Sequence, residues 1–133
     1  MKPTAAPPNP EDPCSLAILD GVLCRVNRKG RAVLRHEPIG TAVVQFRILA
    51  SGNIVALEHP YGFLHGFSNL TCLDQQLRLL WFFASPPDDS LYAEIGDDTA
   101  TTLTLRTTKD SECVVDLVDG KIIAVRSLAQ PVT

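Results

Sequence analysis

The sequence predicts an all-β protein, an antiparallel meander of consecutive blade-like hairpins with little or no helix. Short runs rich in β-branched and aromatic residues alternate between apolar and polar positions with a period of two, which is typical of strands. Gly, Asp, Asn and Pro separate these runs, as they do in turns. No window carries an apolar stripe at helical spacing over three turns, so no substantial helix is expected.

Ten strands are expected, each a short run bounded by turn residues. In chain order they cover residues 22–26, 31–36, 43–49, 53–57, 69–73, 77–83, 91–95, 100–107, 113–117 and 121–126. The nearest helix candidate is 73–82, which Asp74 would cap, but its apolar run 79–83 lacks a polar face. That run is therefore predicted to be a strand with Trp81 at the centre of the core. A sandwich, a barrel and a truncated propeller all fit this pattern.

The chain of 133 residues is long enough for one domain and too short for two sizeable ones. Residues 1–13 contain five of the ten prolines. Because proline has no amide donor and a fixed φ, this stretch is predicted to be a disordered tail. The single all-β domain is placed at residues 14–128, with a C-terminal tail at 129–133.

Composition and charge exclude several kinds of partner. At a net charge of −3 and a pI near 5.5, the molecule is expected to bind neither nucleic acid nor an anionic membrane. No apolar run is long enough to span a bilayer, and the first residues lack the apolar centre of a secretion signal, so a cytoplasmic protein is expected. The four cysteines have no paired spacing and are predicted to be reduced thiols.

An internal repeat places an Asn or Asp between an apolar strand residue and a turn. Asn27, Asp74 and Asp116 hold this place, 47 and 42 residues apart. Each side chain is expected to accept a hydrogen bond from the amide two residues on, in a hairpin turn whose positive-φ position suits glycine. A repeat of this length that carries four strands is typical of a propeller blade.

The pattern is carried by residues 69–123, from Asn69-Leu-Thr-Cys-Leu-Asp through Leu79-Leu-Trp to Val115-Asp-Leu-Val-Asp-Gly-Lys-Ile-Ile. This segment resembles PQQ-like, quinoprotein-type β-propeller blade repeats, and it is similar to short uncharacterised bacterial proteins that end in such a segment. The resemblance implies propeller-like repeats and leaves open an accessory or immunity-type role. It implies no cofactor, because three units cannot close a ring of four to eight blades.

The segment 58–68 departs from the strand pattern, and its last ten residues form the predicted binding loop. They join two strands that a short turn could join, and long ordered loops are usually functional. Aromatic rings offer contact area at low entropic cost, and glycines allow sharp turns. The candidate binding residues are His59, Tyr61, Phe63, His65, Phe67 and Ser68. The competing interpretation is that the rings cap one end of the core.

The sequence favours a non-catalytic interaction domain that binds a protein partner or a second copy of itself. A homo-oligomer is expected because the apolar runs 79–83 and 114–125 are poorly guarded strand edges. The alternative is a β-barrel that binds a small molecule or sugar in its mouth. A third, less favoured class is a metal-dependent or hydrolytic enzyme that uses Glu58, His59 or His65. Their spacing matches no metal or catalytic signature, so no catalytic residue, metal ligand or cofactor is assigned.

Overall fold

Eleven strands and no helix make up the part of the chain that the computed structural model describes, residues 15–64 and 66–128. The strands are, in chain order, β1 (Ser15–Leu19), β2 (Val22–Val26), β3 (Ala32–His36), β4 (Val43–Ile48), β5 (Ile54–Glu58), β6 (Leu70–Leu73), β7 (Leu79–Phe82), β8 (Tyr92–Asp98), β9 (Thr102–Thr107), β10 (Ser111–Asp116) and β11 (Ile122–Ser127). The all-β prediction is confirmed. The tails assigned to 1–13 and 129–133, and His65 of the binding loop, lie outside the described residues.

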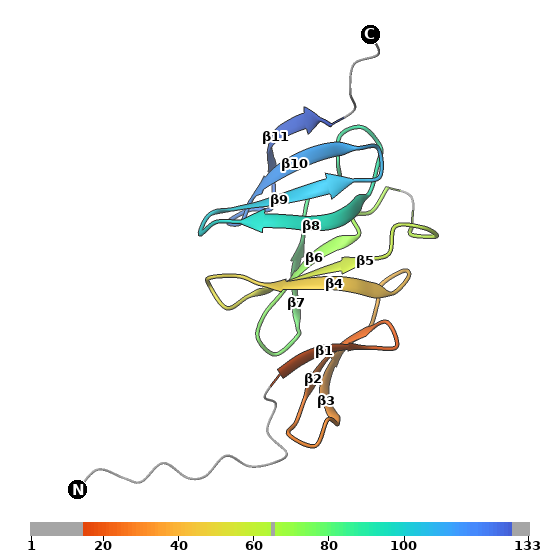
Figure 1. Cartoon of the computed structure of the whole chain (residues 1–133), viewed down its shortest axis with the longest axis vertical. Coiled ribbons are helices and arrows are strands. Elements are labelled where there is room, and N and C mark those ends of the chain that lie inside the picture. The colour runs from red at the N-terminus through yellow and green to blue at the C-terminus, as the bar shows by residue number, and fades with distance from the viewer. Residues whose placement is uncertain (1–14, 65, 129–133) are drawn as a thin grey trace, which may run out of the picture.

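The strands form three antiparallel sheets, and each sheet is a meander of strands adjacent in sequence. The first sheet is β1-β2-β3, the central sheet is β4-β5-β6-β7 and the third sheet is β8-β9-β10-β11. They are stacked in chain order along the long axis of the molecule (Figure 1). None of these sheets closes into a barrel, so the barrel among the predicted closures is wrong for the described residues.

The two inner strands of the central sheet, β5 and β6, are buried on both faces, because the first and third sheets cover them. Successive side chains of each strand point to opposite sides. In β5, Ile54 and Ala56 pack against the first sheet, whereas Val55 and Leu57 pack against the third. All five residues of β5 are buried. A strand that is covered on both faces appears in the sequence as a continuous apolar run, and β5 therefore shows no clear alternation.

The larger core lies between the central and third sheets, and Tyr92 is its largest fully buried side chain. The Tyr92 hydroxyl donates to the carbonyl oxygen of Ala84 at 2.6 Å, and burial raises its pKa. Trp81 is not at the centre of the core as predicted, because β7 is an edge strand. Its indole is half-buried at the margin, with the ring centroid 4.4 Å from that of Phe83, and it lies over Gly120.

The three turns predicted from the repeat are present, and they are alike. In each, the Asx side-chain oxygen accepts a hydrogen bond from the amide two residues on, at 2.7–2.9 Å. Each turn joins the last two strands of its sheet. The positive-φ position is held by Gly30, Leu77 and Gly120. Leu77 therefore has the conformation that glycine has in the two other turns.

One strand, β1, is not predicted from the sequence, because it is apolar almost throughout and has no alternation. The Asp20-Gly21 pair that follows it is a typical hairpin signal, and both residues have a positive φ. In the hairpin, Leu19 pairs with Val22. The ten other strands match the predicted runs, with shifts of a few residues at their ends.

Candidate functional site

The predicted binding loop, residues 59–68, is built from two consecutive turns, and we call it the aromatic loop. The turns cover 60–63 and 64–67, and each is closed by a hydrogen bond from the amide of its fourth residue to the carbonyl oxygen of its first, at 3.2 and 3.4 Å. Gly62 and Gly66 hold the third position of the two turns with a φ of 82°, which other residues rarely adopt. The glycines therefore permit the sharp bend at the third position of each turn.

Glu58 anchors the start of the aromatic loop. Its buried carboxylate accepts hydrogen bonds from the amides of Ile39, Gly40 and Thr41 at 2.8–2.9 Å. The Thr41 hydroxyl donates to the carbonyl oxygen of His59 at 2.7 Å. Three amide donors satisfy the carboxylate, so Glu58 fastens the loop to the segment between β3 and β4 and is not presented to a metal ion or a substrate.

Asn69 anchors the other end of the aromatic loop. Its side-chain amide donates to the carbonyl oxygens of Glu58 and Tyr92 at 2.8 and 2.7 Å. Its side-chain oxygen accepts a hydrogen bond from the Tyr92 amide at 3.0 Å. The buried Asn69 side chain thus links the end of β5 to the first strand of the third sheet. The loop backbone is held at both ends.

The three described aromatic rings of the loop have different environments. Tyr61 is 83% exposed and Phe67 is 58% exposed. Phe63 is 8% exposed, and its ring lies against Gly40, where an added Cβ would be 3.0 Å away. The interpretation that the rings cap the core therefore applies to Phe63 alone. Tyr61 and Phe67 are presented to solvent.

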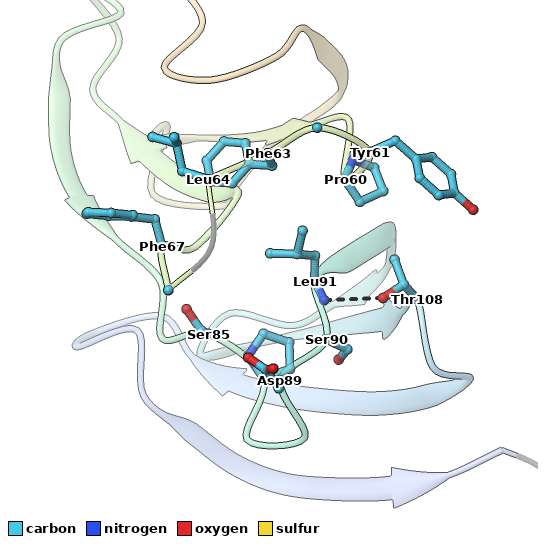
Figure 2. Close-up of a pocket in the computed structure, with 13 residues that line it drawn as sticks. Pro60, Tyr61, Phe63, Leu64, Phe67, Ser85, Asp89, Ser90, Leu91 and Thr108 are labelled. Atoms are coloured by element: carbon cyan, nitrogen blue, oxygen red, sulfur yellow. Dashed lines mark hydrogen bonds between the residues drawn. The ribbon is translucent and has the colours of Figure 1, made fainter.

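A cavity of about 390 Å³ lies between the aromatic loop and the connection from β7 to β8 (Figure 2). One wall consists of residues 60–64 with Gly66 and Phe67. The opposite wall consists of Ser85, Pro86, Asp89, Ser90, Leu91 and Thr108. Figure 2 shows the Leu91 side chain directed into the space and the Tyr61 ring directed outward at its rim. The cavity is therefore lined by connections between strands, and none of the described residues that line it lies within a strand.

Hydrogen bonds also hold the opposite wall of the cavity. The Leu91 amide donates to the Thr108 hydroxyl at 3.3 Å. The Asp88 carboxylate accepts from the hydroxyl and the amide of Ser90, and these bonds, the hydroxyl first, lower its pKa. The neighbouring Asp89 has a positive φ of 62° and borders the cavity. A carboxylate therefore stands beside apolar surface in this wall.

The structure brings some of the candidate binding residues to the cavity and separates the others from it. Those that line it are Tyr61, Phe63 and Phe67. His59 is exposed, its Nδ1 accepts a hydrogen bond from the Tyr61 amide at 3.1 Å, and the two rings are 5.4 Å apart. Ser68 is buried, and its hydroxyl bonds to the backbone of Leu70. Ser68 therefore has a structural role in place of a contact with a ligand.

The second wall of the cavity is not predicted from the sequence. The composition of residues 85–90, Ser-Pro-Pro-Asp-Asp-Ser, is typical of a loop and predicts a loop there. Nothing local places that loop beside the aromatic loop, because their proximity depends on how the sheets stack.

The cysteines and potential metal ligands form no reactive cluster in the described part of the chain. No group of three or more His, Cys, Asp or Glu side chains there could share a metal ion. Cys24, Cys72 and Cys113 are buried free thiols. Burial raises the pKa of each, that of Cys72 to about 11. These thiols are protonated at neutral pH and are poor nucleophiles.

Comparison with known proteins finds no matching protein family, no matching curated protein and no matching solved structure. Among the described residues there is also no helix that could cross a membrane. The functional interpretation therefore depends on the chemistry of the aromatic loop and its cavity.

Proposed function

We propose that the chain is a non-catalytic interaction domain that binds a protein partner through the aromatic loop and the adjoining cavity. The observation that carries this proposal is the exposure of Tyr61 and Phe67 on a loop that Glu58 and Asn69 hold at both ends. Aromatic side chains bury a large area with few rotatable bonds, and Tyr and Trp are enriched among the residues that dominate binding energy.

The anchoring of the aromatic loop by Glu58 and Asn69 supports a binding role, because a loop that is held in place before binding loses less conformational entropy when a partner docks. The cavity indicates which side chains the partner would offer. Leu91 and Phe67 provide apolar surface, and Asp89 provides a negative charge beside it. An apolar or aromatic side chain next to a basic one would be complementary to this lining.

Two of the residues considered for an enzyme, Glu58 and His59, have structural hydrogen bonds, which supports binding over hydrolysis. The Glu58 carboxylate accepts hydrogen bonds from three backbone amides, and the Nδ1 of His59 accepts one from the Tyr61 amide. The resemblance to bacterial propeller-like proteins is consistent with an accessory or immunity-type role, in which binding to one partner is the whole activity.

A second candidate function is the binding of a small molecule or sugar, and the size of the cavity favours it. A volume of about 390 Å³ lies within the range of ligand pockets. The ligand would lie between the central and third sheets and not in the mouth of a barrel. The exposed ring of Tyr61 at the rim would stack on the face of a sugar.

Photocrosslinking tests the proposed function. A photoreactive phenylalanine analogue is placed at Tyr61 of the full chain, expressed in the cells that make the protein. The control position is Val118, which is also 83% exposed and lies in the turn between β10 and β11. We expect one protein to be crosslinked from position 61 and not from position 118.

Affinity measurements with the purified partner complete this test. Tyr61→Ala is expected to weaken binding at least about tenfold, because exposed aromatic anchors often contribute more than 1 kcal/mol. Val118→Ala should leave the affinity unchanged, and neither change should alter the melting temperature. Equal binding by Tyr61→Ala and wild type contradicts the proposal. If a sugar is added in an NMR titration and changes the chemical shifts of Gly62, Leu91 and Thr108 alone, the second candidate function, the binding of a small molecule or sugar, is supported instead.

A further inference from the structure

Among the described residues, the first sheet lacks a strand that the other two sheets possess. Because the three Asx turns lie between the last two strands of each sheet, β3 corresponds to β7 and β11, β2 to β6 and β10, and β1 to β5 and β9. β4 and β8 then correspond as the first strands of their sheets. Within the described residues the first sheet has no strand at this place, and β1 pairs only with β2 (Figure 1). We call this unpaired side of β1 the vacant edge.

The contact between β4 and β8 shows what a strand at this place does. The amide of Ile95 in β8 donates to the side-chain oxygen of Gln45 in β4 at 2.8 Å. Asp98 in β8 pairs with Arg47 in β4 at 2.6 Å. Ile95 is only 7% exposed. β4 therefore covers the face of β8 that points toward it.

The positions of β4 that correspond to Ile95 and Asp98 of β8 face the first sheet. Among the described residues, no strand lies over them as β4 lies over β8. The strand registers make Phe46 the counterpart of Ile95 and Ile48 the counterpart of Asp98. Phe46 is half-buried and Ile48 is 55% exposed. An exposed apolar side chain beside an unpaired strand edge is a template for pairing with another chain.

We propose that the vacant edge accepts an extended strand donated by another protein. Main-chain hydrogen bonds to β1 would provide affinity, and side chains placed over Phe46 and Ile48 would provide selectivity. The correspondence also specifies the chemistry of the donated strand. Arg47 of β4 forms an ion pair with Asp98 of β8. On β4 itself, the position that corresponds to Asp98 holds Ile48, so the donated strand would meet an apolar side chain there. The donated strand therefore carries an apolar residue where β4 carries an arginine.

The segment that directly precedes β1 in the sequence is poorly suited to supply this strand. Residues 1–14 contain five prolines, and each removes an amide donor from a ladder.

A second copy of the chain is also a poor donor. Pairing of β1 with β1 by a two-fold axis would place β4 and β5 of the second copy on the same side of the joined sheet as β4 and β5 of the first. That space is already filled, because the central sheet packs on this face of the first sheet. A free strand from a different protein meets no such obstacle.

Synthetic peptides added to the full-length protein test the proposal. The leucine peptide has the sequence of residues 43–49 with Arg47→Leu and carries terminal lysines for solubility. The arginine peptide keeps Arg47, and the proline peptide carries proline at position 46. We expect the leucine peptide to bind saturably and to slow amide hydrogen exchange in β1. The arginine peptide should bind at least about tenfold more weakly, because its charge would lie against Ile48, and the proline peptide should not bind.

A variant of the protein makes the test specific. Ile48→Asp restores the acid that Arg47 meets on β8, so it should bind the arginine peptide more tightly than the leucine peptide. Ile123→Asp on β11, at a site 57% exposed, is the matched control and should keep the wild-type preference. The proposal is overturned if the leucine peptide leaves β1 exchange unchanged or if Ile48→Asp keeps the wild-type preference. The proposal is also overturned if, without any peptide, amide hydrogen exchange in β1 becomes slower as the protein concentration rises, because a second copy of the chain would then occupy the edge.

Discussion

Replacement of Gly120 by alanine is expected to destabilise the protein far more than the same change at Gly30, although both glycines hold the positive-φ position of equivalent turns. Their φ values are 73° and 79°, so the backbone cost of alanine, about 1 kcal/mol, is the same at both. A Cβ at Gly30 meets nothing within 4 Å, whereas one at Gly120 would lie under 3.0 Å from the ring of Trp81. The indole would have to move, and such overpacking costs about 1–3 kcal/mol. We therefore expect a loss of about 2–4 kcal/mol for Gly120→Ala and about 1 kcal/mol for Gly30→Ala.

Urea unfolding followed by circular dichroism measures both free energies. Trp81 is the single tryptophan of the chain, so its fluorescence reports the position of this ring directly. The emission should shift to longer wavelength in Gly120→Ala and stay unchanged in Gly30→Ala. In a Trp81→Ala background the two glycine changes should cost the same. Equal losses in the wild-type background, or unchanged emission in Gly120→Ala, would refute the packing of this turn on β7.

Four further predictions follow from single residues. Leu77 is buried with a φ of 62°, so Leu77→Gly should be more stable than Leu77→Ala by about 1 kcal/mol in urea unfolding, the reverse of the usual order. Burial lowers the pKa of His36 below 6.5, so as the pH falls the unfolded chain binds a proton at this residue before the folded protein does. The free energy of unfolding should therefore fall as the pH drops below about 6.5, and His36→Leu should remove this dependence on pH. Asn69→Ala leaves the Tyr92 amide and two carbonyl oxygens unpaired and should cost about 3–5 kcal/mol in the same assay. Light scattering should show a homo-oligomer at high micromolar concentration, because the edge strand β7 is apolar and exposed, and Leu80→Lys should reduce it to a monomer.

The fold class and the order of hairpins could be predicted because they depend on local signals. The turns at Asn27, Asp74 and Asp116 form wherever an Asx side chain can accept from the amide two residues on, and the strands between turns follow from alternation. The stacking of the sheets depends instead on which face of each strand is covered. β5 is apolar on both faces, so its sequence does not show which neighbour each residue meets. β1 could not be predicted because its run of apolar residues shows no alternation.

Composition located the aromatic loop but could not describe its environment. Tyr61 and Phe63 are two residues apart and similar in chemistry, yet one is 83% and the other 8% exposed. The difference arises because Gly40, far away in sequence, leaves space for the ring of Phe63. The second wall of the cavity comes from the connection between β7 and β8 and from Thr108. Trp81 is displaced from the core centre by the edge position of β7. Each of these outcomes depends on contacts between sheets, which no local pattern encodes.

The aromatic loop and the vacant edge are linked through one side chain, Glu58. Its carboxylate binds the amides of residues 39–41, which lead into β4, and the aromatic loop begins at the next residue after it. β4 in turn carries Phe46 and Ile48 beside the vacant edge. This link is rigid, because a shift on either side would break hydrogen bonds of 2.8–2.9 Å to a buried carboxylate, and charged hydrogen bonds of this kind are costly to lose. Coupling between sites requires a second conformation that both ligands can favour, and a rigid link offers none. A partner at the aromatic loop and a strand at the vacant edge are therefore expected to bind independently, as two docking points on one rigid body.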